Sequence, residues 1–178
     1  MSPRTIQDLL PLVEMPSRYL GTERNVIHKE WQSVGLKVAL AFPDLYEIGT
    51  SHFGLQILYH LLNEEADILA ERVYAPAEDM EAELRAAGLP LGALESGRPL
   101  ADFDIIGFSL LYELNYTNIL TMLDLAGLAL WAGERSESDP LVIGGGPCAV
   151  NPEPLADIFD AIVVGDGEQV TLEMMRVW

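Results

Sequence analysis

Three consecutive glycines at 144–146, followed by Pro147, end a short apolar run in this sequence. Backbone without side chains forms a tight, permissive turn, and it also lets a large flat ligand approach the main chain. A second turn, at 44–49, reads Asp44-Leu45-Tyr46-Glu47-Ile48-Gly49 and brings together a carboxylate, a phenol and a glycine. The glycines alone favour a simple turn, but the two segments together favour a ligand site.

The usual phosphate-binding motifs do not account for these glycines. Residues 49–54 have the glycine spacing of a P-loop, but Leu55 and Gln56 replace the required Lys and Ser or Thr. The first apolar run leads into Pro43 instead of a Gly-x-Gly-x-x-Gly turn, and the Gly-Asp-Gly at 165–167 lacks a third glycine. A free-standing nucleotide-binding enzyme is therefore disfavoured.

Composition narrows the classes of partner. The 178 residues include 10 Lys and Arg against 28 Asp and Glu, a net charge of −18, which would repel nucleic acid and anionic membrane surfaces. The single cysteine, Cys148, excludes an internal disulfide or a cysteine-ligated cluster within this chain. A single cysteine fits the reducing conditions of a cytoplasm. The N-terminus has no apolar run long enough for a signal peptide. We expect a cytoplasmic domain that binds neither nucleic acid nor membrane by itself.

Apolar runs and amphipathic segments alternate along the chain. The strands and helices that they predict must position the turns at 44–49 and 144–147. The pattern predicts strands at 37–43, 72–76, 104–111, 140–147 and 160–167. It predicts helices at 5–13, 51–65, 78–88, 115–127, 152–159 and 168–178. In the 51–65 helix, Phe53, Ile57 and Leu61 share helical spacing, and Thr50 or Ser51 is available as its N-cap.

This alternation predicts an α/β fold, a flavodoxin-like (Rossmann-like) doubly wound parallel sheet of about five strands. We expect an N-terminal arm at 1–35 and the α/β domain at 36–178. The carboxyl ends of parallel strands meet at one edge of a sheet, so the residues after each strand should converge there. The final helix, 168–178, has no C-cap signal and suggests a domain of a longer polypeptide.

The motifs also resemble a known family. Asp44-x-Tyr46-x-x-Gly49 before a helix, Ser109 at a strand end and the glycines at 144–146 resemble cobalamin-binding domains. GGGPCAVNPEPL followed by VVGDGE, with PSRYLGTERN and FPDLYEIGTSHFGLQILYH, resembles the N-terminal cobalamin-binding-type domain of an uncharacterised radical SAM protein family. The resemblance covers nearly the whole chain.

The resemblance implies a set of cofactor-contacting residues. They are Asp44, Tyr46, Gly49, Ser109, Gly144, Gly145, Gly146, Pro147, Gly165 and Glu168. Tyr46 stands where the cobalamin-binding domains that carry Asp-x-His-x-x-Gly have a cobalt-ligating His, and a phenol with a pKa of about 10 is a poor ligand for cobalt near neutral pH. Cobalamin would therefore bind base-off, without a protein ligand to the metal. His52 is not expected to replace that ligand.

The resemblance leaves two functions open. In the first, the chain is a cobalamin-binding module that serves a downstream radical SAM domain of the same polypeptide and has no catalytic residues of its own. The 4Fe-4S cluster and S-adenosylmethionine would then belong only to that downstream domain. In the second, the domain has kept the fold, has lost cobalamin and serves interdomain docking or substrate recognition. Tyr46 favours the second function, while Asp44, Gly49 and the glycine run favour the first.

Overall fold

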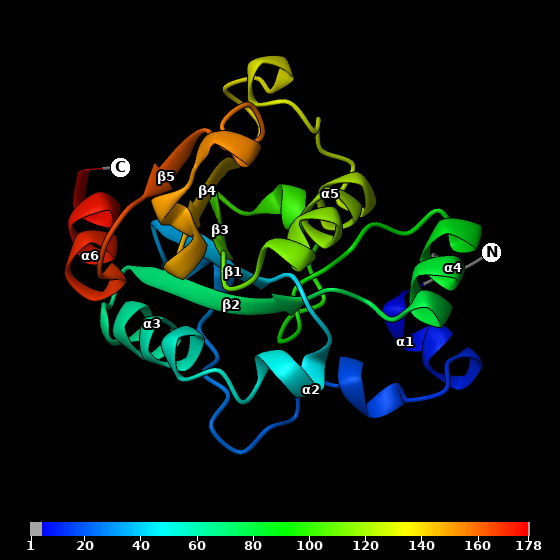
Figure 1. Ribbon diagram of the computed structural model, residues 1–178. Helices are drawn as coiled ribbons and strands as arrows, with labels where there is room; N and C mark the ends of the chain where they lie inside the picture. Colours follow the sequence, from blue (N-terminus) through cyan, green and yellow to red (C-terminus); the bar gives the residue numbers. More distant parts are fainter. Residues whose placement is uncertain (1–4, 178) are drawn as a thin grey trace.

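The computed structural model describes residues 5–177 and has an α/β architecture (Figure 1). Its five strands are β1 (Leu36–Phe42), β2 (Ile68–Tyr74), β3 (Ile105–Ser109), β4 (Leu141–Gly145) and β5 (Ala161–Val163). All are parallel, in the order β2-β1-β3-β4-β5. This order is flavodoxin-like and confirms the predicted doubly wound parallel sheet.

Helices cover both faces of the sheet (Figure 1). They are α1 (Ile6–Leu9), α2 (Tyr46–Gly49), α3 (Phe53–Glu64), α4 (Glu78–Ala87), α5 (Tyr116–Leu125) and α6 (Gly167–Val177). One apolar core joins α3 and α6 to the sheet face that carries Val38 and Leu40. The other core joins α1, α4 and α5 to the opposite face, which carries Ala39 and Ile106. Strand residues alternate between the two cores because successive side chains point to opposite faces.

Short 3-10 turns replace parts of two predicted helices, because proline has no N–H to donate. Those two turns are Leu10–Leu12 and Glu153–Leu155; the other 3-10 turns of the described residues are Pro16–Tyr19, Trp31–Ser33, Leu100–Asp102, Glu113–Asn115, Ala132–Glu134 and Pro147–Val150. At 5–13, α1 gives way to a 3-10 turn that contains Pro11. The helix predicted at 152–159 is only the turn Glu153–Leu155, in a segment that contains Pro152 and Pro154.

The buried side of α3 is not the side on which Phe53 and Ile57 share helical spacing. Phe53 and Ile57 are 77% and 44% exposed, whereas Leu55 and Tyr59 are buried against the sheet. The helix is apolar around most of its circumference, so spacing alone fits either face. The second strand also begins earlier than predicted, at Ile68, where its backbone starts to pair with Leu36 of β1. Glu71, a polar residue within this added part, is buried and accepts hydrogen bonds from Ser96.

The N-terminal segment 5–35 packs along the β2 side of the domain through specific contacts. The Tyr59 hydroxyl accepts from the Ile27 N–H at 2.8 Å, and Lys29 Nζ donates to two backbone carbonyls beside β2. Trp31 lies edge-on to Phe103 and 4.4 Å from the guanidinium of Arg98. These contacts cover the edge strand β2, all of whose residues are buried. Among residues 5–177, no helix has the length and apolar character needed to span a bilayer.

Candidate functional site

A cavity of about 210 Å³ lies between the sheet and helices α3 and α6. Its walls come from β1, β3 and β4, from the end of β5 and the turn after it, and from helices α3 and α6. In this strand order the chain reverses its winding between β1 and β3, which is where open α/β sheets bind ligands. The fold therefore places a cavity at the position expected for a ligand.

The cavity gathers most of the residues that the sequence singled out. Ser109, the glycines at 144–146, Pro147, Gly165 and Glu168 all line it. They come from β3, β4, the turn after β5 and the start of α6, and they meet because parallel strands end at a common edge. Asp44, Tyr46 and Gly49 do not line this cavity.

The floor of the cavity is backbone with few side chains. On the sheet face that meets α3 and α6, Gly107 precedes Ser109 by two residues, and Ser109 pairs with Gly145. Leu40 borders this floor on β1, and Val163 borders it on β5. Gly107 was not among the predicted site residues, although a glycine inside a buried strand is typical of a close backbone approach.

The lining is mainly apolar, with a few hydrogen-bonding side chains. Ser109 and Thr171 offer hydroxyls, His52 an imidazole and Glu168 a carboxylate. Among the described residues, those that line the cavity include no Lys or Arg. Such a cavity suits a neutral, largely apolar group and disfavours a phosphate or another anion.

His52 has a structural role at the cavity wall. Its Nδ1 accepts the Leu55 N–H at 3.2 Å, so His52 is the N-cap of α3 in place of the predicted Thr50 or Ser51. The ring lies 5.3 Å from that of Phe42. Because Nδ1 is an acceptor, Nε2 carries the proton in the neutral ring.

The capping role of His52 predicts a pH dependence of stability. Burial lowers the pKa of His52 below its usual 6.5, so the unfolded chain takes up a proton first as the pH falls. The stability gained from neutral His52 is therefore complete above pH 6.5 and is lost as the pH falls through the lowered pKa. A protonated ring would also place positive charge at a helix N-terminus.

His52→Asn should remove this pH dependence, because Asn caps without titrating. In urea unfolding at pH 7.5 the variant should lie within about 0.5 kcal/mol of the natural chain. At pH 5 the natural chain should have lost more stability than His52→Asn. His60→Asn, at an exposed position of the same helix, is the matched control. Equal losses in the natural chain and His52→Asn would contradict the assignment.

The Asp44 carboxylate supports the turn between β1 and α2. Its Oδ1 accepts the Leu45 N–H at 2.7 Å, and its Oδ2 accepts from the Asn115 amide at 3.3 Å. Asn118 donates to the Pro43 carbonyl at 2.9 Å in the same region. Both Asp44 oxygens therefore have partners in the protein.

Tyr46 is held by residues distant in the sequence. Its hydroxyl donates to Glu23 Oε1 at 2.8 Å, and its ring packs edge-on against Tyr74, with centroids 5.5 Å apart. Burial, together with the hydrogen bond to Glu23, raises the pKa of Tyr46 to about 12. The phenol is therefore neutral near pH 7 and already has a partner, so it is not available as a metal ligand.

Gly49 is required by the packing of Tyr74. A Cβ at position 49 would overlap the Tyr74 ring, with Cδ1 at 2.5 Å, and would come within 3.0 Å of Phe42 Cδ1. Asp44, Tyr46 and Gly49 thus each have a packing or hydrogen-bonding contact inside the protein. Within residues 5–177, no three His, Cys, Asp or Glu side chains gather closely enough to hold a metal ion.

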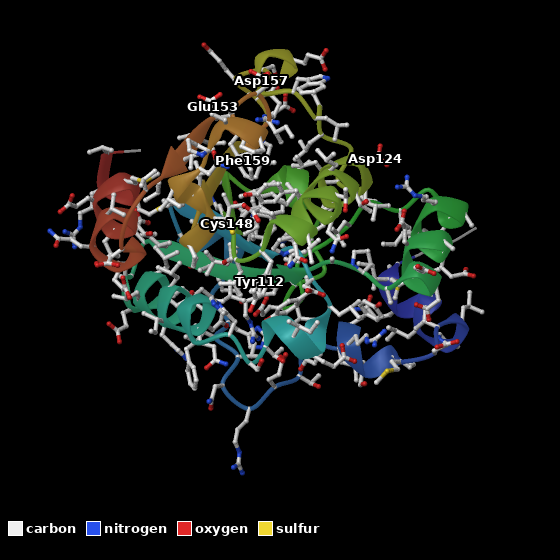
Figure 2. The ribbon with its side chains drawn as sticks, in the orientation of Figure 1. Tyr112, Asp124, Cys148, Glu153, Asp157 and Phe159 are labelled. Carbon is white, nitrogen blue, oxygen red and sulfur yellow. The ribbon has the colours of Figure 1, made fainter. Side chains whose placement is uncertain are left out.

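Cys148 lies beside the glycine turn in a structural contact. Its Sγ donates to the Leu111 carbonyl at 3.3 Å, next to the exposed Tyr112 (Figure 2). Phe159 packs edge-on against Phe108 beneath the same turn, with ring centroids 5.8 Å apart. These contacts hold the turn after β4 against the end of β3.

Comparison with known families identifies the class of the chain. The family described as radical SAM proteins, N-terminal, matches residues 54–178. The chain belongs to this family. The match includes the floor of the cavity and α6, but it begins after the turn that carries Asp44, Tyr46 and Gly49. It thus supports a radical SAM N-terminal domain, and it carries no information on cobalamin. No curated protein matches the sequence.

Proposed function

We propose that this radical SAM N-terminal domain is a cobalamin-binding module that holds the cofactor base-off, with no protein ligand on cobalt. The observation that carries the proposal is the apolar, glycine-floored cavity at the carboxyl edge of the sheet. It fits the neutral planar base of the nucleotide tail. A base held in this cavity is not available to coordinate cobalt, so the base-off form follows.

The residues of this domain would then bind and orient the base of the cofactor. Ser109 would donate or accept a hydrogen bond at the floor, and the backbone at 144–146 would let the neutral base lie against the main chain, with the phosphate of the tail outside the cavity. Bound cobalamin would supply cobalt chemistry to a radical SAM domain downstream in the same polypeptide, which would hold the 4Fe-4S cluster and S-adenosylmethionine. The α/β module at 36–178 and its arm would have no catalytic residues and would act in the cytoplasm.

The proposal can be tested by titrating the 178-residue chain with hydroxocobalamin and methylcobalamin. Visible absorbance, gel filtration and equilibrium dialysis should show stoichiometric retention with a base-off spectrum. Gly145→Trp should weaken binding roughly tenfold or more, because the indole would fill the floor. Asp44→Ala should weaken it less, by loosening the turn between β1 and α2.

Gly133→Trp is the matched control, because a Cβ at Gly133 meets no atom within 4 Å and the residue does not line the cavity. No retention at high micromolar cobalamin, by this chain or by a longer polypeptide that includes the downstream domain, would overturn the proposal.

A docking domain without cobalamin is the second candidate. The turn at Tyr46 is closed by Glu23 and Tyr74, and apolar residues stand exposed near the carboxyl edge, with Phe53 at 77% and Leu114 at 90%. If this candidate is right, Phe53→Asp and Leu114→Asp should weaken association with the downstream domain supplied as a separate chain. The same variants should leave the thermal stability of this domain unchanged.

A further inference from the structure

A smaller cavity, of about 50 Å³, lies between the N-terminal segment and the end of β2, and we call it the arm cavity. Arg18 and Tyr19 of the segment line one side, and Val73 and Tyr74 of β2 line another. The other walls come from α1 and α4, which lie side by side (Figure 1), from Tyr46 and from residues 91–97. Among the described residues, none lines both this cavity and the one between the sheet and helices α3 and α6. The arm cavity is therefore a separate place for a ligand.

Tyr74 contributes a buried hydroxyl to this region. The residue is 8% exposed, and its hydroxyl has no hydrogen-bond partner among the described residues. The nearest charged groups are already engaged, because Arg72 pairs with both Glu95 and Glu23. A phenylalanine would pack in the same way without burying a hydroxyl that lacks a partner, which is unfavourable. Since buried polar groups are nearly always hydrogen-bonded, a molecule in the cavity that Tyr74 lines is the remaining source of a partner.

The polar side chains of the arm cavity are mainly hydrogen-bond donors. The Tyr19 hydroxyl accepts the Ala77 N–H at 3.1 Å, so its own proton remains to be donated. Arg18 carries further N–H donors besides the Nε that donates to Glu47 at 2.7 Å. The Tyr74 hydroxyl is the third donor. Because no Asp or Glu is among the described residues that line the cavity, the ligand has to supply the acceptor.

Charge, polarity and volume limit what that ligand can be. The guanidinium of Arg18 is already paired with Glu47, and the chain carries a net charge of −18, so an anion gains little in this cavity. Met80, Leu84 and Leu91 form apolar walls that suit an aliphatic group. A cavity of about 50 Å³ has room for roughly three or four non-hydrogen atoms, judged by the volume that one water needs.

We propose that the arm cavity binds a small, neutral, largely aliphatic molecule with a hydrogen-bond acceptor, of the size of a short ketone, whose oxygen accepts a hydrogen bond from the Tyr74 hydroxyl. The ligand would contact both the N-terminal segment and the end of β2, so binding would hold the segment more firmly against the domain. The inference does not depend on the proposed function, because the two cavities are separate.

The test compares two probes of the same shape and different charge. We would titrate the 178-residue chain, without cobalamin, with acetone and with acetate, and follow the NMR shift of the Met80 methyl group, which belongs to the cavity wall. Acetone should shift this signal and saturate with a Kd on the order of 10 mM, as expected for so small a ligand. Acetate should bind roughly tenfold more weakly or not at all.

Tyr74→Phe removes the proposed hydrogen bond and keeps the packing of the ring. It should weaken acetone binding roughly fivefold, the effect of one neutral hydrogen bond. Without acetone the variant should unfold at the same temperature as the natural chain or higher, so weaker binding would not reflect damage to the fold. Tyr112→Phe is the matched control, because Tyr112 is exposed and does not line the cavity. It should leave acetone binding unchanged.

Three results would overturn the inference. The first is an unshifted Met80 signal up to about 100 mM acetone, which would show that the cavity takes up only water. The second is equal affinity of Tyr74→Phe and the natural chain for acetone, and the third is equal binding of acetate and acetone. Saturable binding that falls in Tyr74→Phe and not in Tyr112→Phe would support it. Since cobalamin is absent from these titrations, none of the results bears on the proposed function.

Discussion

Replacing Arg72 by Met is expected to lower the free energy of unfolding by about 3–5 kcal/mol, because Glu95 would remain buried without its counter-ion. Arg72 Nε lies 2.6 Å from Glu95 Oε1, and the other carboxylate oxygen accepts the Arg72 N–H at 2.7 Å. The Glu95 side chain is 0% exposed and that of Arg72 is 11% exposed. Removing one partner of such a pair costs far more than replacing both.

The pH dependence of this loss identifies its cause. Burial raises the pKa of Glu95, and Arg72 opposes that rise. Without Arg72 the pKa of Glu95 should rise further, so the folded variant binds a proton that the unfolded chain releases. The variant should therefore lose stability as the pH rises and should approach the natural chain as the pH falls.

Urea unfolding of Arg72→Met, Glu95→Leu and the double variant would measure the coupling between the two residues. The double variant should recover most of the loss, because no unpaired charge remains buried. A loss below about 1 kcal/mol in Arg72→Met would show that Glu95 reaches solvent or another partner.

The same ion pair explains how the N-terminal segment is held. Arg72 also lies 3.2 Å from Glu23, which in turn accepts the Tyr46 hydroxyl. Glu23 thus joins the segment before β1 to the edge strand β2 and to the turn after β1. Glu23, Tyr46 and Arg72 lie far apart in the sequence, so no local pattern could have indicated that Glu23 contacts the other two residues.

The fold itself could be predicted because its signals are local. Each central strand is a continuous apolar run, as expected when both faces are buried, and turn residues separate the runs from amphipathic helices. Gly88 ends α4 in the left-handed conformation, as its position predicts. The buried face of α3 could not be predicted, because its apolar residues surround the helix and only the sheet decides between Leu55 and Phe53.

The candidate site could be predicted in part for the same reason. The residues that follow β3, β4 and β5 meet at one cavity because parallel topology brings strand ends together. The direction of the Tyr46 side chain depends on Glu23 and Tyr74, which the sequence places far away. Gly107 was missed because it lies inside an apolar strand, although an isolated glycine there is itself a signal of an open face.

Gly49→Ala is the second substitution with a large expected effect, a loss of about 3 kcal/mol in the free energy of unfolding. The new methyl group would overlap the ring of Tyr74, which is 8% exposed and packed between Tyr46 and Phe42. A buried aromatic ring in a close-packed core has little room to move. Overpacking at this position should therefore displace α2 or the Tyr74 ring.

A compensating substitution would show that the clash, and not a lost ligand contact, causes the effect. Tyr74→Leu should cost stability alone but should restore part of the loss when combined with Gly49→Ala, because the ring is gone. Tyr74→Phe alone should be neutral or stabilising, since the buried Tyr74 hydroxyl has no hydrogen-bond partner among the described residues. These unfolding measurements are made without any cofactor.

The result decides how the turn after β1 should be interpreted. If Gly49→Ala destabilises the chain and Tyr74→Leu relieves the loss, Gly49 serves the packing of Tyr74. If Gly49→Ala folds with unchanged stability but loses cobalamin, the turn contacts the corrin directly. In that case Tyr74 and Glu23 would have to move away from Tyr46 on binding, and the Tyr46–Glu23 hydrogen bond would be the contact that opens.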